Sequence, residues 1–333
     1  MVSTRPSALY LFAYATVCQR TLISSSSLLF PPLSAVLPLR AAPAIKYAFI
    51  ATHQEEFPVI RLCQVLNVSE SGYYAWRQRE PSQRQREDES LGKRIEDAYQ
   101  NNRQVYGSPR VHAELKAQGV HCGRKRVARL MRERGINAKP RRRKVKTTDS
   151  QHDNPVAPNL LKRDFTADAP NTKWVADITG IGTAEGWLYL AAIVDIYSRL
   201  VVGWAMSKER DEELITKAAE MALSQRKPGA GLVHHSDRGS QYTSQGYLAV
   251  LKAAEVQVSM SRKGDCYDNA LMESFFGTVK EECVEHQAYQ TRAEAKNAVF
   301  EYIEVFYNRQ RRHSSLGYVS PITYEQMRGG TQL

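Results

Sequence analysis

Alternation of apolar and polar residues marks two strands that each carry an acidic residue. The run WVADIT at 174–179 has a period of two, which predicts a β-strand with Asp177 on one of its faces. A second short apolar run at 232–236 predicts another strand, and Asp237 follows its last residue, just before an Arg-Gly turn. Sites in α/β sheets form at strand ends, so both acids are candidate functional residues.

A helical pattern replaces the alternation from residue 268 to about residue 282. At 100° per residue, one arc of this helix carries five apolar residues: Leu271, Met272, Phe275, Phe276 and Val279. Glu273 and Lys280 lie beside that arc, two turns apart on the same face. Glu273 is therefore a third candidate acid, and Lys280 could hold a phosphate as a point charge.

Further amphipathic segments predict helix-turn-helix units in the first half of the chain. Ser108 as an N-cap followed by Pro109 predicts a helix whose apolar face ends near Gly119, and a second helix should run from about 124 to 134. An earlier pair is predicted at 57–66, with Leu62, Val65 and Leu66 on one side, and after a cap at Ser69. That earlier pair could equally be a small bundle with an aromatic core.

A long helix is predicted after the third acid. Thr291 and Glu294 form a capping box for it. Its expected buried stripe consists of Val299, Phe300, Ile303, Phe306 and Tyr307. Basic residues at 309–312 then follow the helix end, where they either complement the helix dipole or lie near a bound polyanion.

Charge changes the interpretation of the helical region. The 333-residue chain has a formal net charge of +11, and residues 101–147 hold fifteen Lys or Arg against two acids. Nucleic acid is the commonest partner of such a segment. The expected DNA contacts besides Lys280 are Arg124, Lys125, Arg126, Arg129, Arg132, Arg141, Arg142 and Arg143. The basic run at 139–146 could track phosphates or serve as a solvated tether.

The three acids suit one kind of chemistry. In-line displacement at a phosphodiester uses one metal ion on the attacking oxygen and one on the leaving oxygen, roughly 3.5–4 Å apart. Hard ions such as Mg²⁺ or Mn²⁺ prefer carboxylate ligands, and Asp177, Asp237 and Glu273 would supply them. A single acid is more often a solvated surface residue, but the strand-linked pair and the apolar ESFF context favour a site. The five Cys and eight His form no zinc motif, and the odd, scattered Cys count suits a reducing cytoplasm.

Several long runs resemble one known family. WVADITGI, DIYSRLVVGWAMS, HHSDRGSQYTS, SMSRKGDCYDNALMESFFGTVKEE and YNRQRRHSSLGYVSP are similar, in order and spacing, to the integrase-type transposases of IS3-family bacterial insertion sequences, specifically the product of the second reading frame. The resemblance covers roughly residues 46–326. It implies an α/β fold, an RNase H-like integrase core with a mixed sheet flanked by helices, preceded by an all-α helix-turn-helix region.

The resemblance also implies an activity. Asp177, Asp237 and Glu273 would be the catalytic and metal-binding DDE triad, with two Mg²⁺ or Mn²⁺ ions, and Lys280 would match the family's basic residue after the Glu. The expected function is metal-dependent DNA cleavage and strand transfer at the terminal repeats of an insertion sequence and at target DNA. The segment at 309–313 would close the core and lie near the DNA.

The expected organisation follows from these patterns. We expect an extension at 1–45, disordered or arising from a start-site artefact; a helical DNA-binding region at 46–147; an extended, mobile linker at 148–170; a catalytic core at 171–326; and a tail. Prolines interrupt any membrane-spanning helix in the first segment. The resemblance implies homo-oligomers on DNA in the bacterial cytoplasm, nucleoid-associated, and an upstream-frame partner or fusion. The alternatives are a non-catalytic DNA-binding protein or repressor and a simple nuclease.

Overall fold

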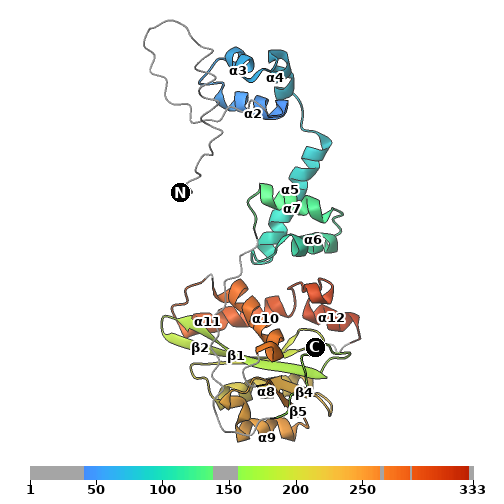
Figure 1. The fold of residues 1–333 in the computed structure, drawn as a ribbon, viewed down its shortest axis with the longest axis vertical. Helices are drawn as coiled ribbons and strands as arrows, with labels where there is room; N and C mark the ends of the chain where they lie inside the picture. Colours follow the sequence, from blue (N-terminus) through green and yellow to red (C-terminus); the bar gives the residue numbers. More distant parts are fainter. Residues whose placement is uncertain (1–40, 138–156, 263–265, 286, 330–333) are drawn as a thin grey trace. The chain divides into compact units, whose positions relative to one another are not determined.

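The chain forms two compact units. The computed structural model describes residues 41–137, 157–262, 266–285 and 287–329, and Figure 1 shows the elements. One unit extends to Glu87 and the other runs from Asp88 to the C-terminus. The division falls within helix α5 (Gln83–Asn101), inside the predicted helical region at 46–147. Most of the predicted extension lies outside the described residues.

The first unit is a three-helix bundle, α2 (Pro43–His53), α3 (Val59–Leu66) and α4 (Glu70–Arg77). Its small core contains Leu62, Leu66 and the fully buried Tyr73. The predicted cap is confirmed, because Gly72 donates its backbone N–H to the Ser69 hydroxyl. Val65, expected on the buried side, is instead 39% exposed.

Three helices open the second unit. The part of α5 from Asp88 onward packs with α6 (Ser108–Ala117) and α7 (Arg124–Glu133). Gly107 rather than Ser108 is the N-cap of α6, and Gly119 adopts a left-handed φ of 77° after the helix, as its predicted end requires. The apolar face of α7, formed by Val127, Leu130 and Met131, is buried as predicted.

A five-stranded sheet forms the centre of the second unit. Its strands are β1 (Lys173–Thr183), β2 (Gly186–Asp195), β3 (Val201–Ser207), β4 (Val233–Ser236) and β5 (Gln257–Met260), in the order β3-β2-β1-β4-β5. The first three form an antiparallel meander, whereas β4 and β5 are parallel to β1. The sheet is mixed, as the resemblance implied.

Helices cover both faces of this sheet. α8 (Glu212–Arg226) and α9 (Gln245–Ala253) pack against one face around Ala176, Ile193 and Val202. α10 (Ala270–Val279) and α11 (Arg292–Phe300) cover the other face around Val175, Ala192 and Val194. Figure 1 shows the two groups on opposite sides of β1 and β2. Because both faces are covered, β1 is buried nearly throughout.

Each of the two long C-terminal helices ends in a π-helical segment. α10 continues into Lys280–Val284, and α11 continues into Glu301–Tyr307. The predicted capping box is present, with the Thr291 hydroxyl accepting from the N–H of Glu294. Phe300 departs from the predicted stripe: it is 52% exposed and its ring lies edge-on to Trp204, while Tyr302 is buried instead.

Short elements complete the unit. They are the 3₁₀ turns Ser240–Thr243, Cys266–Asn269 and Ser314–Leu316, and helix α12 (Pro321–Met327). Residues 157–170, predicted as part of a mobile linker, are held on the core instead. Leu161 is buried, and the N–H of Leu160 donates to the Ser259 hydroxyl at 2.9 Å. In the described ranges, no helix has the length and apolar character needed to span a membrane.

Candidate active site

Asp177 lies on the central strand of the sheet. Asp177 pairs with Ala192 of β2. Its carboxylate accepts a hydrogen bond from the backbone N–H of Ile178 at 2.8 Å. The side chain is half-buried, because helices cover both faces of β1. The predicted strand is therefore confirmed, and a central strand gives this acid a rigid support.

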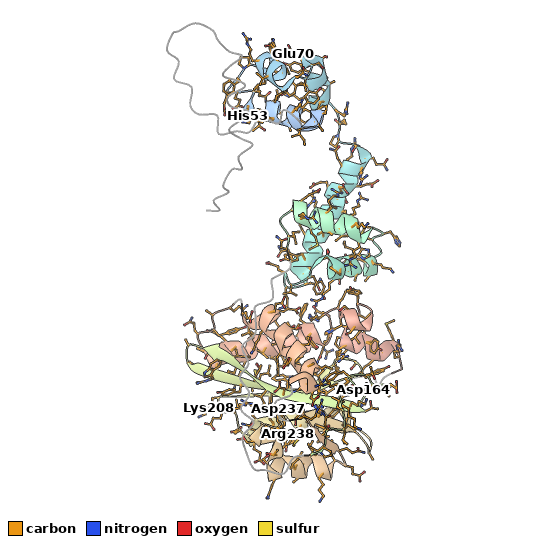
Figure 2. All side chains as sticks on the ribbon, viewed as in Figure 1. His53, Glu70, Asp164, Lys208, Asp237 and Arg238 are labelled. Atoms are coloured by element: carbon orange, nitrogen blue, oxygen red, sulfur yellow. The ribbon has the colours of Figure 1, made fainter. Side chains whose placement is uncertain are left out.

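Asp237 follows the end of β4, beside Asp177. The parallel register pairs Trp174 with His234 and Val175 with His235, two residues before Asp177 and Asp237. The Asp237 carboxylate accepts the N–H of Gly239 at 2.9 Å, which fixes the turn after the strand. Figure 2 labels Asp237 and its sequence neighbour Arg238 in the second unit.

Glu273 extends from the first turn of α10. The apolar residues around it, including Met272 and Phe276, are buried against the sheet, while Glu273 itself is exposed. The predicted amphipathic helix is confirmed. Lys280 begins the π-helical segment after α10 and is half-buried.

The charges of Asp237 and Glu273 both act on Asp177. Burial, then the neighbouring charge of Asp237, raises the pKa of Asp177 to about 8; the charges of Arg210 and Glu273 contribute smaller and opposite shifts. Clustered carboxylates of this kind are costly unless a proton or a cation neutralises them. Their oxygen-only donor set matches the preference of Mg²⁺ and Mn²⁺.

The carboxylates do not yet converge on one point. Within the ranges that the structure describes, no three Asp, Glu, His or Cys side chains lie close enough together to hold one ion. Asp177 and Asp237 are neighbours, and Glu273 is the exposed member with the longest side chain. It would have to turn toward the aspartates for all three to share cations.

Asp268 fixes the start of the helix that carries Glu273. Its buried carboxylate accepts hydrogen bonds from the backbone N–H and side chain of Arg262, from Arg163 at 3.0 Å and from Asn159 at 2.9 Å. The bonds from Arg262 hold the pKa of Asp268 far below its usual range. This cluster ties the end of β5 and residues 159–163 to the beginning of α10.

Two residues near the aspartates were not predicted from the sequence. Arg210 follows β3, is exposed, and accepts on its backbone oxygen a hydrogen bond from Gln241. Tyr242 is buried, with its ring edge-on to Tyr247. Burial, and then the charges of Asp177 and Asp237, raise the pKa of its hydroxyl. No local sequence pattern predicts either residue, because the two come near the aspartates only when distant parts of the chain pack together.

The predicted DNA contacts of α7 fall into two groups. Arg124, Lys125 and Arg132 are exposed, as predicted. Arg126 and Arg129 instead both pair with Asp88 of α5 at 2.6 Å, and Arg129 pairs also with Glu133. Arg141, Arg142 and Arg143 lie outside the described residues.

The basic segment at 309–313 forms ion pairs within the second unit. Arg311 is 3% exposed and forms two hydrogen bonds to Glu282. Arg312 pairs with Glu114 of α6 at 2.7 Å. The two guanidinium groups therefore join parts of the second unit to one another, and only Arg309 of the three is exposed.

The adjacent histidines are structural. His234 lies within hydrogen-bond distance of the Tyr247 hydroxyl, whereas His235 faces the hydroxyls of Ser259 and Ser261. Burial lowers the pKa of each to about 4. The two adjacent rings therefore contact different residues, and each is part of the packing around β4.

The mixed five-stranded sheet with helices on both faces is an RNase H-like integrase core. The comparisons agree: residues 167–266 and 273–328 match families described as integrase core domain, and residues 85–144 match an HTH-like domain. Transposase InsF of insertion sequence IS3A from Escherichia coli (strain K12) is 44% identical over 283 residues, covering 84% of this chain and 98% of that protein. The chain belongs to the IS3 family of insertion-sequence transposases, within the retroviral-integrase-like superfamily.

Other relatives extend the comparison. The protein named insertion element IS600 uncharacterized 31 kDa protein, from Shigella sonnei, is 49% identical over 265 residues, covering 80% of this chain and 97% of that protein. Among solved structures, the HTLV-2 integrase catalytic core domain in complex with magnesium is 18% identical with a TM-score of 0.37, over 48% of this chain and 99% of that one. The integrase core families and the bacterial transposase relatives make the chain an enzyme of the polynucleotidyl transferase type.

Proposed function

We propose that Asp177, Asp237 and Glu273 are the catalytic carboxylates of this transposase. The observation that carries the proposal is the parallel pairing of β1 with β4, together with the action of the Asp237 charge on Asp177, which puts the two carboxylates near each other. Glu273 completes the set from α10, and its charge acts on Asp177.

Divalent cations fit this set of residues. The charges of Asp177 and Asp237 oppose each other in a half-buried setting, and a cation would relieve that repulsion. We propose Mg²⁺ or Mn²⁺, two ions, held by Asp177, Asp237 and Glu273. When bound, such ions supply charge neutralisation at the attacking and leaving oxygens of a phosphodiester.

The proposed reaction has two steps, hydrolysis at the element end and transfer of that end to target DNA. In the first, water attacks a phosphodiester at the element end, a phosphorus–oxygen bond breaks, and the departing 3′ oxygen takes a proton. In the second, that 3′ hydroxyl attacks a target phosphodiester, loses its proton and displaces the target's own 3′ oxygen. The chain's residues position both strands, because the phosphoryl group itself needs no covalent help from the protein.

We propose that α7 contacts the DNA through its exposed basic residues, Arg124, Lys125 and Arg132. All three are exposed, and Lys125 and Arg132 lie opposite the buried apolar face of the helix. Arg126 and Arg129 remain proposed contacts, but each would have to share its guanidinium with Asp88. Lys280, two turns after Glu273, is the proposed phosphate contact nearest to the carboxylates.

Assembly on paired ends is part of the proposal. Cutting and joining two element ends needs two active sites, so we propose a homo-oligomer on the terminal repeats, working in the bacterial cytoplasm on nucleoid DNA, together with the upstream-frame protein. Sedimentation of the protein with and without end DNA tests whether it forms a homo-oligomer. Addition of the upstream-frame protein to a joining reaction tests whether that partner is needed.

Strand cleavage and joining test the proposed function. A labelled duplex bearing the element's ends is incubated in Mg²⁺ with the wild type and with Asp177→Asn, Asp237→Asn or Glu273→Gln. Glu220→Gln serves as the matched control, because Glu220 is exposed on α8 and plays no part in the proposed site. We expect each of the three variants to lose joined product by at least about a hundredfold, with the control unchanged.

The same reaction separates the alternatives. Nicked strands without joined strands would indicate a simple nuclease. Metal-independent binding with no cleavage, even after the upstream protein is added, would indicate a non-catalytic DNA-binding protein or repressor. Either result would overturn the proposed function.

A further inference from the structure

Asn269 occupies the junction between the candidate site and α10. It is the last residue of the 3₁₀ turn Cys266–Asn269 and the N-cap of α10, four residues before Glu273. It is 6% exposed. Its neighbour Asp268 is held by Arg262, Arg163 and Asn159, so the backbone at this junction has little freedom.

The side chain of Asn269 does not act as a cap. An Asn at the N-cap ordinarily accepts a hydrogen bond from a backbone N–H of the first turn. Here no side-chain cap bond forms, and the Oδ1 atom has no hydrogen-bond partner among the residues that the structure describes. A buried unpaired acceptor costs stability, so this arrangement is not explained by folding alone.

The same side chain reaches the strand of Asp177 instead. Its Nδ2 donates to the backbone oxygen of Ala176 at 3.3 Å, and Ala176 directly precedes Asp177. One amide therefore ties the helix that carries Glu273 to the strand that carries Asp177. Because Oδ1 belongs to that same planar amide, the unpaired acceptor also lies beside the backbone of Ala176.

We propose that Asn269 is a positioning residue for divalent-cation binding. Through Ala176 it ties the N-terminal end of α10, which carries Glu273, to the backbone beside Asp177. Its Oδ1 can then accept a hydrogen bond from a donor that enters with the hydrated ion. The inference rests on the proposed function. Residues that orient metal ligands in this way typically contribute ten- to a hundredfold in affinity.

Manganese binding and thermal stability together test the inference. Mn²⁺ is titrated into full-length protein without DNA and followed by electron paramagnetic resonance, and the unfolding temperature is measured without metal. Asn269→Ser is the main variant, because Ser is an equally good N-cap but cannot reach Ala176. We expect Mn²⁺ affinity to fall by about tenfold or more, while the unfolding temperature stays the same or rises.

A second variant separates positioning from charge. Asn269→Asp keeps the shape but replaces the donor with a carboxylate, which would attract a cation by charge alone. We expect Asn269→Asp to bind Mn²⁺ no more tightly than the wild type. Tighter binding by Asn269→Asp, or unchanged affinity in Asn269→Ser, would overturn the inference.

Glu273→Gln distinguishes this inference from the proposed function. If Glu273→Gln weakens Mn²⁺ binding and Asn269→Ser does not, only the role of Asn269 fails. If Glu273→Gln leaves Mn²⁺ binding unchanged, the carboxylate site itself fails, and the inference fails with it.

Discussion

Arg311 and Glu282 form a buried, two-point ion pair, with nitrogen–oxygen distances of 2.6 and 2.7 Å. Both carboxylate oxygens of Glu282 are fully used, since Tyr302 also donates to one and Arg110 of α6 to the other. Burial alone would raise the pKa of Glu282, but the bonds from Arg311 outweigh it and the pKa is lowered. The pair joins the segment that follows the Glu273 helix to the segment after α11.

Removal of one partner of this pair should be strongly destabilising. Glu282→Ala would leave the guanidinium of Arg311 buried without a counter-charge, which typically costs about 3–5 kcal/mol. Urea unfolding followed by tryptophan fluorescence measures the change. Glu213→Ala is the control, because Glu213 forms an exposed pair with Lys217 on α8, and about 0.5 kcal/mol or less is expected there. Similar losses in the two variants would contradict this account.

Close contact between β3 and α8 predicts a second stability effect. A Cβ atom at Gly203 would meet the backbone oxygen of Ala218 and the side chain of Ala222. Gly203→Ala should therefore cost about 1–3 kcal/mol through overpacking. Gly229→Ala introduces the same methyl group into open space. A neutral Gly203→Ala, measured beside that control by thermal unfolding, would show that the strand and helix are not in close contact.

Burial of His234 predicts loss of stability in acid. Its pKa is lowered from 6.5 to about 4, first by burial and then by the charge of His235. The unfolded chain therefore takes up a proton before the folded one does, and this stability is present above pH 6.5 and lost as the pH falls toward 4. One such group contributes at most about 1.4 kcal/mol per pH unit.

The measurement is the free energy of unfolding at several values between pH 7 and pH 4. His234→Gln removes the titrating ring and keeps a polar side chain near the Tyr247 hydroxyl. We expect a shallower pH dependence in this variant. An identical slope in variant and wild type would show that His234 titrates normally in the folded protein.

The exposed face of α7 predicts a defined effect on DNA binding. Neutralisation of Lys125 or Arg132 should weaken binding to any duplex about equally and lower the salt dependence of binding by about one unit for each residue neutralised. Arg129→Ala should act partly through stability instead, because Arg129 pairs with Asp88 and Glu133. Binding measured across a salt series decides between them, and an unchanged slope for Lys125→Ala would exclude that residue as a phosphate contact.

The sequence predicted the local helices and strands of the core better than the long-range contacts between them. The period of two around Asp177 and the helical spacing around Glu273 are local properties, and both appear as predicted. The neighbouring placement of Asp177 and Asp237 depends on strand register, which pairing across the sheet decides. The prediction that Phe300 is buried was wrong, because the buried stripe of this helix includes Tyr302 instead.

Basic residues were the hardest to interpret from the sequence. Arg311 and Arg312 have the composition of a DNA contact, yet their acidic partners, Glu282 and Glu114, lie far away in the chain. Asp88 of α5 likewise forms ion pairs with Arg126 and Arg129 of α7. A charge run predicts an acidic partner, but only the folded structure shows whether that partner belongs to the chain itself.

A change of metal preference tests the central claim most directly, that Asp177 holds a catalytic cation. Asp177→Cys replaces a hard oxygen ligand with a thiolate, which Mn²⁺ accepts more readily than Mg²⁺ does. Cleavage of a duplex bearing the element's ends is measured in each metal, with Glu220→Cys as the control. The account predicts that Asp177→Cys is inactive in Mg²⁺ and regains cleavage in Mn²⁺. Cleavage by a folded Asp177→Cys protein at the wild-type rate in Mg²⁺, or no recovery in Mn²⁺, would contradict it.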